Sequence, residues 1–196
     1  MFHISDDIRA KNSAAMIRDG LLACLAELPF DQISVTDICH RSHVSRTTFY
    51  RLFDTPTDII RWSVEHETKQ LCQAFSESGL TDTEWPFRFS LEYIFEHPNV
   101  MELAILANRV DIANAAFQCN IKTVMERMLN RSDASDEDMR YSDAIVSAII
   151  VAIFSTWIKS GKKDSQEQVL ERVTRILQII STANVSKARE RRIRQQ

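Results

Sequence analysis

Residues 33–53 read ISVTDICHRSHVSRTTFYRLF, and this stretch predicts two short helices joined by a tight turn. Ser34 and Ser45 each precede a helical run, and a serine hydroxyl at that position accepts hydrogen bonds from the first N–H groups of a helix. The first run ends near Ser42 and the second reaches Phe53. The pattern therefore predicts a helix-turn-helix.

Each of the two short helices has an apolar face. The residues expected to be buried are Val35, Ile38 and Cys39 on the first helix, Val44 in the turn, and Phe49, Leu52 and Phe53 on the second. The other face of the second helix carries Arg46, Thr47 and Tyr50, with Thr48 and Arg51 at its flanks. Arginine can pair with guanine, threonine offers a hydroxyl or a methyl, and a tyrosine hydroxyl can reach a phosphate. These residue types favour a helix that lies in the major groove of DNA.

The charge of the chain supports DNA binding only locally. A net charge of −3 and a pI near 6.0 lack the basic character usual in nucleic-acid-binding domains. Residues 39–53 nevertheless contain three arginines, two histidines and no acidic residue. Attraction to phosphate must therefore come from this stripe and from helix N-termini.

The same stretch resembles the DNA-binding domain of the TetR/AcrR family of transcriptional regulators. The resemblance rests on Asp37-Ile38, Val44-Ser45 and Thr48-Phe49-Tyr50 in register with Phe53, and it extends over roughly residues 8–65. It implies a DNA-binding domain at 1–54 with a recognition helix at about 45–51. A helical regulatory and dimerisation domain would follow at 55–186, with a basic tail at 187–196.

Two positions depart from the family pattern. His43 stands where the turn generally has glycine, and Thr55-Pro56-Thr57 stands where the next helix generally begins with lysine. A histidine in a left-handed conformation costs on the order of 1 kcal/mol. Without the lysine, the Thr57 hydroxyl and the helix N-terminus would hold the phosphate. The predicted DNA-contacting residues are Ser34, Thr36, Ser45, Arg46, Thr47, Tyr50 and Thr57.

The rest of the chain predicts an all-α protein of about nine helices, because three glycines and four prolines are few for a β fold of 196 residues. Helices are expected at 6–28, 34–42, 45–53, 55–79, 85–97, 98–106, 110–129, 141–160 and 165–180. The polar residues 130–138 are expected to form a surface loop. The tail from Lys187 to Gln196 is expected to be a solvated helix end, with DNA contact and attraction to an anionic membrane as alternatives.

The penultimate long helix has a composition suited to dimerisation. Ala144, Ala148 and Ala152 alternate with Ile145, Ile149, Ile153 and Trp157, so small residues allow close approach and large ones fill the seam. The alternative is an internal core helix. Resemblance to the family implies a four-helix bundle across a two-fold axis, and residues 157–169 and 91–106 are similar to the C-terminal domain of one of its branches.

A ligand pocket would be lined by aromatic and methionine side chains of the larger domain. The candidates are Trp62, His66, Phe89, Tyr93, Phe117, Met125 and Phe154. Each of them taken singly is more often plain core, so no ligand-binding residue is assigned. The class of ligand is not readable from these residue types.

Several classes of site have no support in the sequence. Cys24, Cys39, Cys72 and Cys119 lie far apart, so neither a metal site nor a disulfide framework is expected. No convergent nucleophile, base or ligand set suggests an enzyme or a cofactor. The first residues lack a signal-peptide pattern, and the apolar segment 144–158 is too short to span a bilayer. A cytoplasmic protein without a membrane partner is expected.

The sequence thus predicts a homodimeric repressor that binds a palindromic double-stranded DNA operator and is released by a small-molecule effector. A second interpretation is a DNA-binding regulator with no small-molecule ligand, switched by a protein partner or acting as an activator. A larger domain without a cavity would favour that second interpretation.

Overall fold

Helices and short turns make up the described part of the chain. The computed structural model describes residues 1–79, 85–128 and 135–193, with the side chains of 1–79, 88–119 and 135–180. The helices in these ranges are α1 (Ile8–Leu25), α2 (Val35–Ser42), α3 (Arg46–Leu52), α4 (Pro56–Glu77), α5 (Trp85–Glu96), α6 (Asn99–Leu106), α7 (Val110–Met128), α8 (Asp136–Lys159) and α9 (Gln166–Ile193). The expected all-α fold of about nine helices is confirmed.

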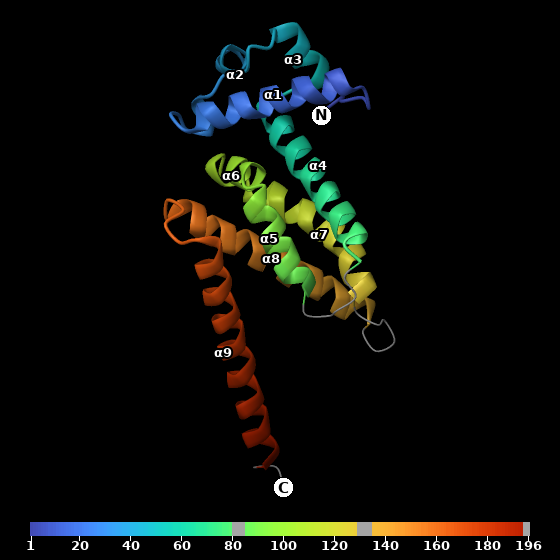
Figure 1. Ribbon diagram of the computed structural model, residues 1–196, viewed down its shortest axis with the longest axis vertical. Helices are drawn as coiled ribbons and strands as arrows, with labels where there is room; N and C mark the ends of the chain where they lie inside the picture. The colour runs from blue at the N-terminus through green and yellow to red at the C-terminus, as the bar shows by residue number, and fades with distance from the viewer. Residues whose placement is uncertain (80–84, 129–134, 194–196) are drawn as a thin grey trace.

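The first three helices form one end of the molecule (Figure 1). α1 buries the stripe Ala10, Ala14, Ile17 and Leu21, whose spacing of three and four residues places them on one face. α2 and α3 pack against this helix. Gly20 makes the approach of α2 possible, because a Cβ at that position would lie 2.7 Å from the Ser42 Cβ and 2.9 Å from the Ile38 carbonyl oxygen.

The turn between α2 and α3 depends on a left-handed residue. His43 follows the last residue of α2 with φ 55° and ψ 24°. Glycine adopts this conformation without steric cost, so the strain predicted for a histidine here is present in the fold. The left-handed residue reverses the chain and brings Ser45 to the start of α3.

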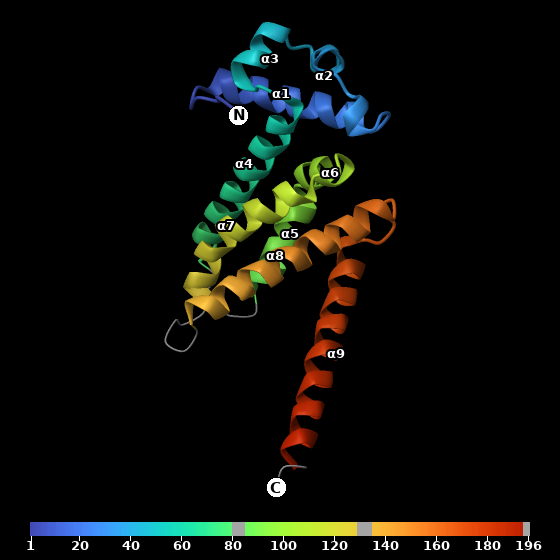
Figure 2. The ribbon, with the colours of Figure 1, turned by 180° about the vertical axis from the view of Figure 1, so that it is seen from behind.

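The long helix α4 leaves this end and runs into the larger group of helices (Figure 2). It contacts α1 near its beginning and α5, α6 and α7 further along. α8 lies against α6 and α7, and its Ile150 and Phe154 are fully buried. α9 contacts α5 at its start and then extends away from the body (Figures 1 and 2).

Several helix boundaries differ from the expected ones, and three of the differences have a clear local cause. α1 begins at Ile8, because the Asp7 carboxylate, not Ser5, accepts a hydrogen bond from the Arg9 N–H at 3.0 Å. α8 begins at Asp136, because Ser135 and Asp138 form a capping box within the segment expected to be a loop. α9 continues to Ile193, well past the expected end at 180. The residues after 180 include neither glycine nor proline, so nothing there breaks the helix.

α8 is also longer than the apolar segment 144–158 that was judged too short to span a bilayer. Among the described residues it is the one helix whose length and composition would suit a membrane crossing, a test that core helices of water-soluble proteins also pass. Its buried side, with Ile150 and Phe154, packs against other helices of the same chain. The sequence underestimated the length of this helix because only its apolar centre was counted.

Replacing Gly20 by alanine should destabilise the protein by about 1–3 kcal/mol, because the new methyl group meets backbone atoms of α2 that cannot move separately. Urea unfolding followed by circular dichroism measures the change. Asp19→Ala is the matched control, since Asp19 is exposed and its ion pair with Arg18 lies at the surface. A Gly20→Ala protein as stable as this control would show that α1 and α2 are not in close contact.

Replacing His43 by glycine should stabilise the protein by up to about 1 kcal/mol, because glycine adopts positive φ without steric cost. His43→Ala removes the imidazole but keeps the Cβ, so it should give no such gain. The midpoints of urea unfolding for the two variants compare the effects. A loss of stability with glycine would mean that the imidazole itself holds the turn together.

Candidate functional site

Both short helices begin at well-formed caps. At α2 the Ser34 hydroxyl accepts from the Asp37 N–H at 3.3 Å, while the Asp37 carboxylate accepts from the Ser34 N–H at 2.9 Å. At α3 the Ser45 hydroxyl accepts from the Thr48 N–H at 3.2 Å. The hydrogen bonds from Ser34 lower the pKa of Asp37, so its carboxylate is charged near neutral pH, next to the positive end of α2.

The two faces of α3 are sharply different. Phe49 and Leu52 are buried, and the Phe49 ring meets the Phe53 ring with centroids 6.0 Å apart. On the other face Arg46 and Thr47 are exposed, and the Tyr50 side chain is 56% exposed. The residues predicted to read bases thus share one accessible surface of the helix.

The predicted contact residues outside α3 lie around the same surface. Ser34 and Thr36 are exposed at the start of α2. The Thr36 hydroxyl accepts a hydrogen bond from the Arg46 guanidinium, which joins α2 to α3 across the turn. Arg41 pairs with Glu27 of the segment after α1. Six of the seven predicted residues are exposed together, and the seventh, Thr57, is half-buried at the start of α4.

Thr57 has a neighbour that the sequence did not indicate. The Arg109 guanidinium, which precedes α7, lies 3.5 Å from the Thr57 hydroxyl and forms an ion pair with Asp111 at 2.8 Å. Arg109 follows Asn108, whose φ is 54°. The Arg109 backbone N–H donates a hydrogen bond to the Ala104 carbonyl. This turn brings a cation of the larger helix group beside the first turn of α4.

The N-terminal segment holds the end of α3 in place. Phe2 pairs with Phe53 in an antiparallel bridge, and the His3 N–H donates to the Leu52 carbonyl at 2.8 Å. The Met1 amine lies 2.8 Å from the Asp58 carboxylate, which also closes the capping box of α4 with Thr55. The C-terminal end of the exposed helix is therefore fixed to the beginning of α4.

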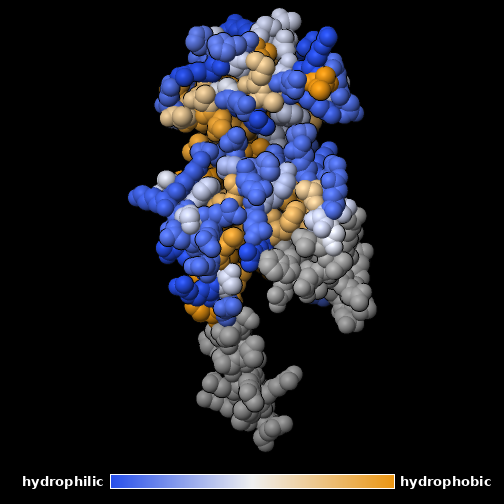
Figure 3. Space-filling model, in the orientation of Figure 1, coloured by the Kyte–Doolittle hydropathy of each residue, from blue (hydrophilic) through white to orange (hydrophobic). Residues whose placement is uncertain are grey.

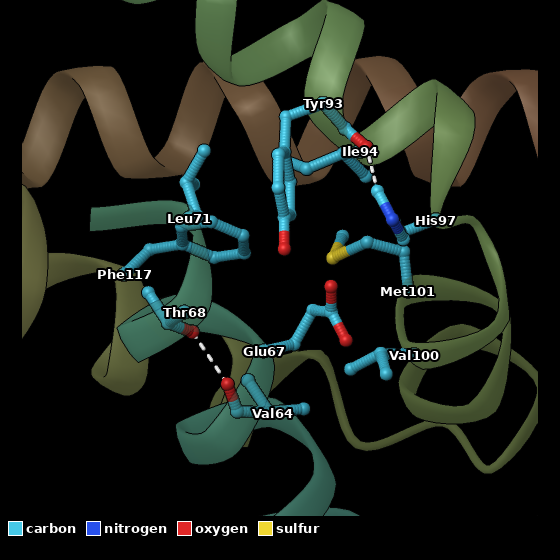
Figure 4. Close-up of a pocket in the computed structure, with 10 residues that line it drawn as sticks. All are labelled: Val64, Glu67, Thr68, Leu71, Tyr93, Ile94, His97, Val100, Met101 and Phe117. Carbon is cyan, nitrogen blue, oxygen red and sulfur yellow. Dashed lines mark hydrogen bonds between the residues drawn. The ribbon is translucent and has the colours of Figure 1, made fainter. Parts of the chain in front are cut away.

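A pocket lies within the larger helix group, between α4, α5, α6 and α7 (Figure 4). The cavity itself is small, about 10 Å³, and the open space counted out into the solvent at its mouth is about 290 Å³. Its lining residues are Val64, Glu67, Thr68, Leu71, Tyr93, Ile94, His97, Val100, Met101 and Phe117. Most of these side chains are apolar, and the Thr68 hydroxyl is already bonded to the Val64 carbonyl.

Glu67 is the acidic residue of this pocket. Its carboxylate points inward, and the Tyr93 hydroxyl points toward it (Figure 4). Burial raises the pKa of Tyr93, and the charge of Glu67 raises it further. The phenol is therefore neutral near physiological pH and remains a hydrogen-bond donor.

Two of the seven candidate pocket residues from the sequence, Tyr93 and Phe117, line the pocket. Trp62 and Phe154 are core residues, His66 stacks on Trp62, and Phe89 packs against Phe75. The Met125 side chain lies outside the described residues. The sequence did not indicate Glu67, because its pocket neighbours come from three other helices. The only feature of Glu67 that the sequence shows is its position next to His66.

Comparisons with known proteins give matches among solved structures. No family model and no curated protein matches the chain. The structure of Lin0861 from Listeria innocua matches with a TM-score of 0.68 and 19% identity, covering 91% of this chain and 96% of the other. The fatty acid degradation regulator FadR from Bacillus halodurans matches with a TM-score of 0.62 and 15% identity, covering 84% and 94%.

A TetR family transcriptional regulator from Chloroflexus aurantiacus matches with a TM-score of 0.44 and 15% identity, covering 89% of this chain and 88% of the other. The first two matches extend over most of both chains. The chain therefore has the overall fold of Lin0861 and of the regulator FadR.

Proposed function

We propose that this protein is a TetR-type transcriptional repressor that binds a palindromic DNA operator as a homodimer and is released by a small-molecule effector. The observation that carries the proposal is the surface of α3. Arg46, Thr47 and Tyr50 are exposed there, while Phe49 and Leu52 on the opposite face anchor the helix. A helix fixed in this way suits insertion into the major groove.

Dimerisation is supported by the apolar surface of α9. Ile176, Leu177, Ile179 and Ile180 are all exposed, in a part of the helix that projects from the body (Figure 3). They continue the stripe of Val169 and Val173, which packs on the core nearer the start of α9. A run of exposed branched side chains is typical of a subunit interface.

Exposed residues of α8 are consistent with the same interface. Tyr141 and Ile145 are exposed, and so are the small residues Ala148 and Ala152. The small residues would let a helix of a second subunit approach closely. We therefore propose that α8 and α9 of two copies form the four-helix contact.

Effector release is supported by the pocket along α4. The same helix carries Thr57 at its first turn and Glu67 at the pocket. A ligand that shifts α4 would thus change the position of the helix-turn-helix in each subunit.

The proposed division places DNA binding in residues 1–54 and regulation and dimerisation in 55–186. Ser34, Thr36, Ser45 and Thr57 would contact phosphates, and the exposed face of α3 would contact bases. The basic residues of 187–196 have side chains outside the described residues, and we assign them no role in binding.

Selection from random duplex DNA should enrich a palindrome whose half-sites are about one helical turn apart, roughly 34–36 Å. On the selected duplex, Arg46→Ala and Tyr50→Phe should each weaken binding, the arginine change by about 1–3 kcal/mol. Titration by fluorescence anisotropy at two salt concentrations measures the affinities.

Arg88→Ala is the control for these variants, because it removes one exposed arginine of α5 away from α3. It should leave DNA affinity within twofold of the parent (about 0.4 kcal/mol). Circular dichroism and molecular mass should be unchanged in all three proteins. Absence of an enriched sequence, or equal affinities for all variants, would exclude the proposed mode of DNA binding.

Ile176→Glu combined with Ile180→Glu should convert a dimer into a monomer, because two carboxylates would be buried in the proposed interface. Light scattering after size exclusion measures the mass. Glu171→Lys is the control: it changes a charge on the opposite face of α9 and should leave the dimer intact. A monomeric parent protein, or a dimeric double variant, would refute the assignment of this interface.

A further inference from the structure

His43 combines backbone strain with a side chain that has no partner in the described part of the chain. Its φ of 55° and ψ of 24° lie in the left-handed region, which has a steric cost for every residue with a Cβ. The imidazole is exposed, and among the described residues it forms no hydrogen bond, ion pair or ring contact. Strain that the fold itself does not require is typical of residues that bind a ligand.

An open groove of about 520 Å³ connects His43 with the predicted DNA-contacting surface. The groove lies between the end of α1 and α2, and both His43 and Thr36 line it. The Thr36 hydroxyl accepts a hydrogen bond from the Arg46 guanidinium, so residues that are expected to face DNA form one edge of the groove. His43 also stands two residues before Ser45, which caps α3. The imidazole is therefore adjacent to the surface that is proposed to enter the major groove.

The carboxylates around this groove already have partners. The charged and titratable groups that line it with His43 are Glu27, which follows α1, and Asp37, His40 and Arg41 of α2. Glu27 forms an ion pair with Arg41. Asp37 accepts hydrogen bonds from the N–H and the hydroxyl of Ser34, and the charge of His40 also helps to lower the pKa of Asp37. The His43 imidazole thus has no anion of this chain as its partner.

We propose that His43 is a further DNA-contacting residue, whose protonated imidazole donates a hydrogen bond to a backbone phosphate of the operator beside the bases that α3 contacts. A phosphate diester is the anion that double-stranded DNA presents at the edge of the major groove. Residues 39–53 contain no acidic side chain that would repel it. A charge-assisted hydrogen bond of this kind is stronger than a neutral one and can offset the strain at the turn. This inference rests on the proposed function, since it adds a residue to the proposed DNA-binding surface.

The contact makes operator affinity depend on pH. Histidine is the side chain whose charge normally changes between pH 5 and pH 8. A neighbouring phosphate favours the charged form of an imidazole, so operator binding is linked to proton uptake. Operator affinity therefore rises as the pH falls through this range and declines as the imidazole loses its proton.

The test compares the parent chain with His43→Gly on the selected duplex, by fluorescence anisotropy at pH 6.0 and pH 8.0 over a series of salt concentrations. At pH 6.0 the plot of log affinity against log salt concentration should be less steep for the variant by about 0.9 per subunit, because one phosphate contact is lost. At pH 8.0 the two slopes should agree. Between pH 6.0 and pH 8.0 the parent should lose at least fivefold in affinity and the variant less than twofold.

Two further variants separate the charge of the side chain from its place in the turn. His43→Lys keeps a Cβ and carries a permanent charge, so at pH 8.0 it should bind within threefold of the affinity that the parent has at pH 6.0. His40→Gln is the matched control, because His40 lines the same groove but lies near Asp37. It should keep both the salt slope and the pH dependence of the parent.

Equal salt slopes for the parent and His43→Gly at pH 6.0 would overturn the inference, and so would a His43→Lys protein that binds no more tightly at pH 8.0 than His43→Gly. A His43→Gly protein that is less stable than the parent in urea would also overturn it, because the imidazole would then have a structural role. A parent that enriches an operator but fails these comparisons leaves the proposed repressor intact. A parent that enriches no operator would instead refute the proposed function, and this inference with it.

Discussion

The contact between Phe53 and Trp62 holds the helix-turn-helix on α4. Phe53 is fully buried, with its ring centroid 6.0 Å from that of Phe49 and 5.9 Å from that of Trp62. The Phe53 ring thus contacts both Phe49 of α3 and Trp62 of α4. Together with the N-terminal segment, which joins Leu52 and Phe53 to the first turn of α4, this contact couples the orientation of α3 to α4.

In the proposed mechanism α4 links the pocket to the helix-turn-helix, because it is a single continuous helix. Its first turn is capped by Thr55 and Asp58, while its middle carries Glu67 at the pocket. A helix of 22 residues moves as a rigid rod, so a small rotation at the pocket produces a displacement at the other end. Arg109, which touches Thr57 from the larger group, would limit the directions of that movement.

The sequence predicted the helix-turn-helix well because the features that form it are local. Ser34 and Ser45 cap helices within three residues of themselves, and the left-handed conformation of His43 follows from the turn. The start of α8 shows the limit of that reasoning. Ser135 and Asp138 carry the same kind of local signal, but the polar residues around them suggested a loop.

The pocket could be predicted only in part, because its lining comes from four helices. Tyr93 and Phe117 were recognised as aromatic candidates, but Glu67 has no partner in the sequence that marks it. The candidate DNA-binding surface could be predicted from the sequence of α3 alone. The opposite faces of α3 are fixed by helical periodicity, so burial of Phe49 and Leu52 leaves Arg46 and Tyr50 exposed.

The hydrogen bond from Arg46 to Thr36 also lowers the conformational entropy of the Arg46 side chain in the free protein. An arginine on a surface normally samples many rotamers, and ordering it on binding costs about 0.5–1.5 kcal/mol. Here one N–H of the guanidinium is held by the hydroxyl of α2, and the group has four further N–H donors. Part of that ordering is therefore complete in the free protein, so in the proposed complex the arginine would lose less conformational entropy on meeting a base than an unpaired arginine would.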